Sequence, residues 1–154
     1  MRLIGIFLLY LAFSSSALAL DVPPLRGHVN DYAGILSPRA VQELETRLAD
    51  FERSDSTQLV VLTIPSLAGE NLKEYSIKVA ESWKVGMKGL DNGAILLIAK
   101  QERKVRIEVG RGLEGKLTDL VSGRIIRGEI APRFKAGDFD FCYDVVVSHS
   151  NQPF

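Results

Sequence analysis

Hydrophobic and polar positions follow two different periods along this chain, and their alternation predicts strands interleaved with helices. Unbroken aliphatic runs occupy Gln58–Ile64 and Gly93–Ala99, which is typical of strands buried on both faces. Apolar and charged residues alternate over Lys104–Val109, which predicts a strand with one solvated face. Only the polar turn 100–103 separates the last two strands, so they should form an antiparallel hairpin.

Three other segments carry apolar residues at helical spacing. They begin at Ser37, Asn71 and Thr118, and we expect them to end at Arg53, Trp83 and Pro132 respectively. The first start is the clearest, because Ser37 can cap free N–H groups and Pro38 suits the first helical position. The second helix lies between the strands 58–64 and 93–99, which should therefore be parallel, with a right-handed connection. The predicted sheet is thus mixed.

The first 19 residues have the features of a secretory signal peptide. Arg2 precedes the apolar run Leu3–Phe13, and Ala17-Leu18-Ala19 fits the small-x-small cleavage rule. The apolar run is shorter than the roughly 20 residues that span a bilayer, although an uncleaved anchor is the alternative. We expect cleavage after Ala19 and export to the periplasm or cell envelope, which leaves a mature chain that begins at Leu20. Residues 20–36 form an arm rich in turn-forming residues.

Composition excludes several classes of function. The chain has 19 basic and 19 acidic residues, so it lacks the positive charge that nucleic-acid binding requires. One cysteine excludes an intrachain disulfide framework and a zinc site built from several thiolates. Neither His28 nor His149 forms a recognisable nucleophile pair with a serine or cysteine, so no catalytic residue is assigned.

Oxygen-bearing side chains gather around one predicted end of the sheet. In the hairpin, the residues before strand 93–99 lie beside the loop 110–115 that follows strand 104–109. Four candidate ligands, Asp91, Asn92, Glu114 and Asp119, therefore lie in loops or at a helix start near one edge, where they would suit Ca²⁺ or Mg²⁺. The alternative is that they shape turns and cap a helix, which are the commoner uses of Asp and Asn.

The loop Gly110–Gly115 also matches the pattern G-x-G-x-x-G of dinucleotide-binding proteins. Its context does not fit that function, because the preceding strand belongs to an antiparallel hairpin and Asp119 opens the following helix, where a pyrophosphate would dock. We expect no nucleotide cofactor, and we expect the glycines to let the loop fold tightly against the sheet.

The ordered set of motifs resembles the TPM domain, a family that includes a plant thylakoid-lumen photosystem II repair factor and many exported bacterial proteins. The motifs are VNDYAGILS (29–37), QLVV (58–61), Trp83, DNGAILL (91–97), RIEVGRGLEG (106–115), Thr118-Asp119, PRF (132–134) and GDF (137–139). The resemblance implies a three-layer α-β-α sandwich with a small mixed sheet flanked by helices. We assign the domain to residues 37–141, and residues 142–154 depart from the family pattern in a way that suggests a truncation or a frame change.

The resemblance also implies a function. Some family members act as accessory factors for membrane-protein complexes, and the plant member is described as an acid phosphatase with divalent cations at an acidic loop cluster. The positions that match this cluster are Asp91, Asn92 and Asp119, and Glu114 is added from the hairpin geometry. We expect an accessory or quality-control factor for envelope membrane proteins that binds a divalent cation. The alternative is a weak metal-dependent acid phosphatase, so the sequence leaves open whether the chain is an enzyme.

Overall fold

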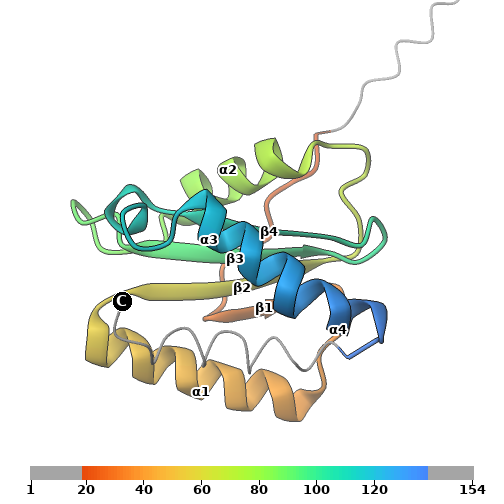
Figure 1. The fold of residues 1–154 in the computed structure, drawn as a ribbon, viewed down its shortest axis with the longest axis horizontal. Helices are drawn as coiled ribbons and strands as arrows, with labels where there is room; N and C mark the ends of the chain where they lie inside the picture. The colour runs from red at the N-terminus through yellow and green to blue at the C-terminus, as the bar shows by residue number, and fades with distance from the viewer. Residues whose placement is uncertain (1–18, 139–154) are drawn as a thin grey trace, which may run out of the picture.

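A four-stranded mixed sheet forms the centre of the protein. The computed structural model describes residues 19–138. The strands β1 (Val29–Asp31), β2 (Gln58–Ile64), β3 (Gly93–Ala99) and β4 (Lys104–Val109) lie in the order β1-β2-β3-β4 (Figure 1). The first three strands are parallel, and β4 pairs antiparallel with β3, with Ala94 opposite Val109 and Ala99 opposite Lys104. The predicted hairpin and the predicted parallel pair are both confirmed.

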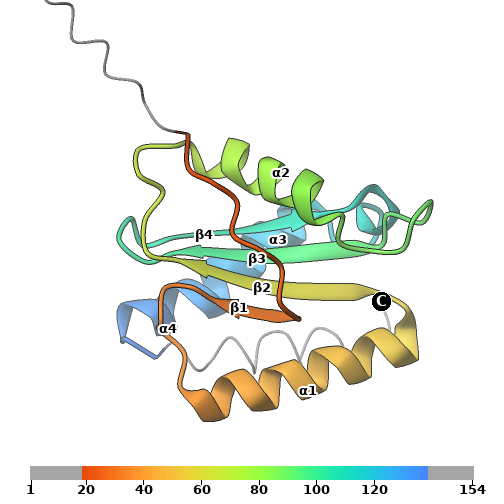
Figure 2. The same ribbon diagram turned by 180° about the vertical axis from the view of Figure 1, so that it is seen from behind.

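Helices cover both faces of the sheet, which confirms the sandwich (Figures 1 and 2). The described helices are α1 (Pro38–Asp55), α2 (Leu72–Trp83), α3 (Asp119–Ile125), the π-helical segment η2 (Ile126–Ile130) and α4 (Ala131–Lys135), with a short 3-10 turn η1 (Arg111–Leu113) after β4. One hydrophobic core joins the sheet to α1 and α3, and includes Leu44, Leu48 and Ile125. The other core joins the opposite face to α2 through Tyr75 and Val79.

The predicted helix starts are confirmed by their capping hydrogen bonds. The Ser37 hydroxyl accepts from the Ala40 N–H at 3.1 Å, and the Asn71 side chain accepts from the Lys73 N–H at 2.9 Å. The Thr118 hydroxyl accepts from the Val121 N–H at 3.3 Å. Each cap satisfies a donor that the helix itself leaves unpaired.

The expected end of the third helix is wrong, because the chain stays helical beyond Pro132 as far as Lys135. Pro132 lies in the first turn of α4, a position that suits proline because its ring fixes a helical φ. The π-helical segment η2 directly precedes α4 and changes the hydrogen-bond register at this point. Pro132 therefore marks a change of helix type.

The arm that precedes α1 contains a strand that the sequence pattern does not reveal. Val29 and Asn30 in β1 lie opposite Val61 and Leu62 in β2. Three residues are too few to show a period of two, and Asn and Asp are rare in strands. Most of the predicted signal peptide (residues 1–18) and the whole tail 142–154 lie outside the described residues. Among residues 19–138, no helix combines the length and the hydropathy that crossing a membrane requires.

Candidate functional site

Two loops meet at the end of the sheet where β3 begins and β4 ends. We call residues 84–92 and 110–118 the sheet-end loops. The Gly110 N–H donates to the Gly93 carbonyl at 2.7 Å, and the Gly112 N–H donates to the Asp91 carbonyl at 3.1 Å. The predicted proximity of Asp91 to the glycine loop is therefore confirmed for the main chain.

Glycine is required in this loop because the two main chains pack directly against each other. A Cβ atom at Gly112 would lie 1.9 Å from the Leu90 carbonyl oxygen, and one at Gly110 would lie 2.1 Å from the Asp91 carbonyl oxygen. Backbone atoms cannot move aside as a flexible side chain can, so only glycine fits at these two positions. This contact explains the G-x-G spacing without a bound phosphate.

Asn92 has a structural role in the same region. Its Oδ1 atom accepts from the Met87 N–H at 2.8 Å, and its Nδ2 atom donates to the Ser56 carbonyl at 2.6 Å. The side chain thus fastens the loop that precedes β3 to the C-terminal end of α1. The three predicted carboxylates, on Asp91, Glu114 and Asp119, are all on exposed residues.

These carboxylates are not grouped as the ligands of a metal ion would be. Within residues 19–138, no three His, Cys, Asp or Glu side chains are grouped in a way that could hold a metal ion. Asp119 lies instead along a pocket that Val105 and Ile107 of β4 also line. The arrangement therefore shows no preformed ligand set for the predicted cation, and cation binding here stays a prediction.

Exposed apolar side chains accompany the acidic residues of the sheet-end loops. Met87 and Leu90 are 50% and 56% exposed, and Leu120, directly after Asp119, is 67% exposed. Single exposed apolar residues are ordinary, but these three all belong to the sheet-end loops or to the first turn of the helix that follows. The region therefore offers carboxylate and apolar groups to a partner.

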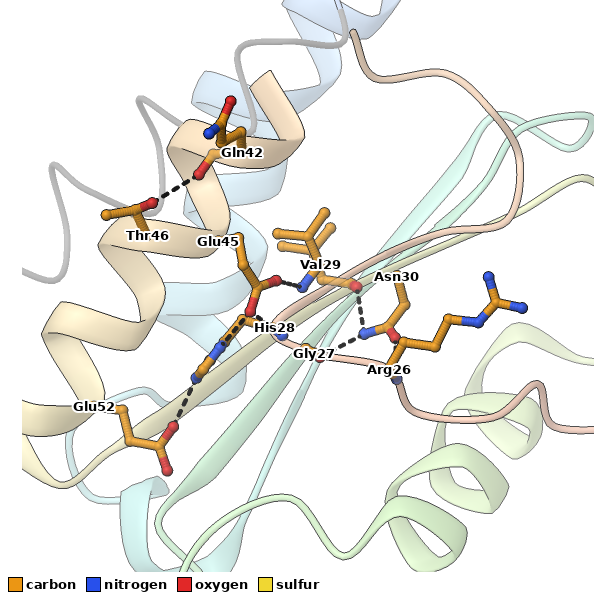
Figure 3. Close-up of polar contacts among 10 residues, drawn as sticks. Arg26, Gly27, His28, Val29, Asn30, Gln42, Glu45, Thr46 and Glu52 are labelled. Carbon is orange, nitrogen blue, oxygen red and sulfur yellow. Dashed lines mark hydrogen bonds and ion pairs between the residues drawn. The ribbon is translucent and has the colours of Figure 1, made fainter. Parts of the chain in front are cut away.

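A second polar cluster surrounds His28, the residue before β1 (Figure 3). Its Nδ1 atom lies 2.8 Å from Glu45 Oε1 and its Nε2 atom 2.7 Å from Glu52 Oε2, with the imidazole 16% exposed. Burial by itself would lower the pKa of His28, but the hydrogen bonds and charges of Glu45 and Glu52 outweigh it and raise that pKa. The same arrangement lowers the pKa of Glu45 against the opposing effect of its own burial.

Sequence reasoning missed this cluster. His28 lies 17 residues from Glu45 and 24 from Glu52, so no local motif connects them. The available signal is the spacing of Glu45 and Glu52, which lie two turns apart on one face of α1. Because each glutamate takes a different ring nitrogen, the cluster has the geometry of a structural clamp.

Comparisons with known proteins agree with the fold and identify the family. A family model described as the TPM domain matches residues 29–149, past residue 141 where the predicted domain ends. The solution NMR structure of the N-terminal domain of a protein from P. gingivalis is similar, with 32% identity, a TM-score of 0.73, and 79% of this chain and 78% of that chain covered.

The N-terminal domain of the cg2496 protein from Corynebacterium glutamicum, also solved by NMR, has a TM-score of 0.59 over 88% of this chain and 90% of that chain. Its 19% identity supports the fold alone. No match was found among curated proteins. The family model covers most of the chain, and the P. gingivalis domain shares nearly a third of its aligned residues. The chain therefore belongs to the TPM domain family.

Proposed function

We propose that this protein is an exported accessory or quality-control factor that acts beside envelope membrane proteins and contacts them through its sheet-end loops. The observation that carries the proposal is the exposure of Met87, Leu90 and Leu120 in and beside the sheet-end loops. The exposed carboxylates of Asp91 and Asp119 lie in the same region, on a loop and at the start of α3 respectively. Exposed apolar side chains that occur together in one region favour contact with a partner over simple solvation. Family membership and the signal-peptide features of residues 1–19 support the setting.

The proposal includes a divalent cation at the same loops. Asp91, Asn92, Glu114 and Asp119 have the oxygen donors that Ca²⁺ and Mg²⁺ prefer. Because the described residues hold no ready group of three such ligands, a cation would have to draw the side chains together. The ordering that this requires opposes binding, so we expect affinity in about the millimolar range that flexible extracellular calcium sites show.

Site-directed photocrosslinking in intact cells tests the accessory role. A photoreactive residue at Leu90 should form adducts with a small set of membrane proteins, and the same residue at Ile77 serves as the control. Ile77 is also a partly exposed apolar residue, but it lies on α2. Adducts from Leu90 alone support the proposal, whereas equal or no adducts at the two positions contradict it.

A second measurement separates the accessory role from metal-dependent phosphatase activity. The purified mature chain is assayed for phosphomonoester hydrolysis with Mg²⁺, with Ca²⁺ and with a chelator, beside the variant Asp91→Ala. Cation-dependent turnover that Asp91→Ala abolishes would favour the enzyme. Background rates under all conditions would leave the accessory role as the function to pursue.

A further inference from the structure

The outer edge of the sheet carries unpaired main-chain groups. β4 is the last strand in the order β1-β2-β3-β4, so one side of it has no partner strand among the described residues. The hydrogen bond from the Gly110 N–H to the Gly93 carbonyl makes Gly110 and Gly93 a hydrogen-bonded pair of the hairpin. Such pairs alternate along an antiparallel ladder, so Lys104 and Arg106 also bond to β3. The N–H and C=O groups of Val105 and Ile107 therefore point outward.

A pocket of about 460 Å³ runs along this part of β4. The start of α2 contributes Lys73 to its lining, α3 contributes Ser122, and η2 contributes Ile126. α2 and α3 cover opposite faces of the sheet (Figures 1 and 2). Because residues from the start of α2, from α3 and from β4 line the same pocket, it is a slot between two helices along the free strand edge. A slot of this form is where proteins add an extended peptide to a sheet.

The two sides of the slot differ in chemistry. Val105 and Ile107 pack with the core under α3, on the same side as Ile126. The side chain of Arg106 lies on the opposite face of the strand, where its Nε donates to the Ser76 hydroxyl of α2 at 2.9 Å. Lys104 is two residues from Arg106 and so lies on the same face of β4. The α2 side of the slot is therefore basic, and the α3 side is largely apolar.

Two features of the lining favour a ligand over empty solvent. The Ser122 side chain is 95% buried, and its hydroxyl has no hydrogen-bond partner among the described residues. A buried hydroxyl without a partner is unfavourable, and a peptide group beside it would supply one. Lys73 and Lys104 form no ion pair within residues 19–138. The charge of Lys104 also acts on the Glu102 carboxylate, so Lys73 is the freer of the two to attract an acidic ligand.

Basic residues on edge strands also serve to prevent aggregation, which is the alternative explanation of Lys104. That role requires charges that project from the edge. Arg106 instead turns back onto the protein, where it also lies 2.7 Å from Glu108. It leaves the outward groups of Val105 and Ile107 uncovered by its own side chain.

We propose that β4 binds an extended segment of a partner protein as a fifth strand, and that this segment alternates apolar and acidic residues. The period of two in a strand would place the apolar residues on the α3 side, beside Ile126, and the acidic residues on the α2 side, beside Lys73 and Lys104. Asp119, the acidic residue in the lining, lies on α3 and so opposes a segment that is acidic throughout. The inference deepens the accessory function proposed above and rests on it for the source of the segment.

The test uses a fluorescent seven-residue peptide of alternating valine and glutamate with blocked ends, and the purified mature chain. At nine-tenths saturation, hydrogen exchange of the Val105 and Ile107 amides should slow by about tenfold. The Arg106 amide, already bonded to β3, serves as the internal control. A matching peptide of alternating valine and lysine should bind more weakly.

Two N-methylated forms of the peptide test the strand pairing directly. Methylation of the valine nitrogens blocks antiparallel addition, and methylation of the glutamate nitrogens blocks parallel addition. Loss of binding in one form and not the other supports the fifth strand. Equal binding of both forms would show attraction by charge alone and would overturn the proposal.

Variants of the chain complete the experiment. Ile107→Pro removes an outward N–H and leaves the ladder to β3 intact, so it should weaken binding about tenfold. Lys104→Glu changes only an exposed charge and should weaken it about fivefold, whereas Lys135→Glu on α4, outside the slot, should not change it. No protection of Val105 and Ile107, or self-association of the chain through β4 in place of peptide binding, would refute the proposal. The assay uses neither a cation nor a membrane protein, so its failure is distinct from failure of the crosslinking test.

Discussion

Glu45 on α1 accepts three hydrogen bonds at the start of β1, and one of them comes from the imidazole Nδ1 of His28 at 2.8 Å. The main-chain N–H of His28 donates to Oε1 at 3.0 Å, and that of Val29 donates to Oε2 at 2.7 Å. One carboxylate thus holds the chain at the point where the short edge strand begins. Gly27 allows this approach, since a Cβ atom there would lie 2.9 Å from Glu45 Oε1.

The clamp predicts that the free energy of unfolding depends on pH in two opposite ways. The raised pKa of His28 gives a contribution that is complete below its ordinary value of 6.5 and is lost as pH rises through the folded-state pKa. The lowered pKa of Glu45 gives a contribution that is complete above its ordinary value of 4.5 and is lost as pH falls through the folded-state pKa. Both contributions are present between these two ordinary values.

The variant His28→Gln should remove the alkaline part of this dependence. We expect it to lower the free energy of unfolding at pH 5.5 by about 1 kcal/mol and to have a smaller effect at pH 8.5, because the glutamates are partly exposed. Urea unfolding at the two pH values measures the difference. Arg39→Gln, which removes an exposed pair with Glu43, is the matched control. An equal loss at both pH values would show that His28 acts through packing alone.

The contact between the sheet-end loops predicts different outcomes for two glycines of one loop. Gly112→Ala should lower the free energy of unfolding by about 3 kcal/mol, since the new methyl group would lie 1.9 Å from the Leu90 carbonyl oxygen. Gly115→Ala is the control, because a Cβ atom there has nothing within 4 Å, and it should change stability by less than about 0.5 kcal/mol. Thermal unfolding of the two variants compares them. Similar melting temperatures would contradict the close packing of these main chains.

Much of the fold follows from short-range signals in the sequence. β2 and β3 are predictable because continuous aliphatic runs are typical of buried strands. All seven residues of β3 and the last five of β2 are buried. The helix starts are predictable because Ser37, Asn71 and Thr118 act within three residues of their own positions. The hairpin follows from the length of its turn, and the hairpin in turn places Asp91 beside the glycine loop.

The features that the sequence does not reveal depend on long-range packing. β1 is held by pairing of Val29 with Val61, and the clamp joins His28 to a helix face 17 residues away. The position of Asp119 depends on how α3 lies against β4, which no local pattern encodes. Connectivity alone therefore assigns Asp91, Asn92 and Glu114 to one end of the sheet. The distances between their side chains could not be predicted.

The N-terminal arm predicts an effect of signal-peptide cleavage on stability. The Leu20 N–H donates to the Glu70 carboxylate, and Lys78 Nζ donates to the Leu20 carbonyl at 2.5 Å. If cleavage follows Ala19, the Leu20 nitrogen becomes a charged amino group beside Glu70, and the hydrogen bond becomes charge-assisted. Glu70→Gln should then destabilise a chain that begins at Leu20 by about 1 kcal/mol more than a chain that begins at Ala17.

Chemical denaturation of both chains, each with and without Glu70→Gln, measures that difference. Glu81→Gln, an exposed residue later on α2, should have the same small effect in both chains. If Glu70→Gln destabilises the two chains equally, the new amino group makes no ion pair with Glu70.

Asn92→Asp separates the two roles considered for Asn92. Aspartate retains an oxygen that can accept from the Met87 N–H but loses the donor to the Ser56 carbonyl, so the cation-free protein should lose about 1–2 kcal/mol of stability. If the sheet-end loops bind Ca²⁺, the added charge should at the same time enlarge the rise in melting temperature that millimolar Ca²⁺ produces. Asn71→Asp is the matched control, because aspartate caps a helix as well as asparagine does. Melting curves with Ca²⁺ and with chelator measure both effects. A destabilised variant that gains no response to Ca²⁺ would leave Asn92 with its structural role alone.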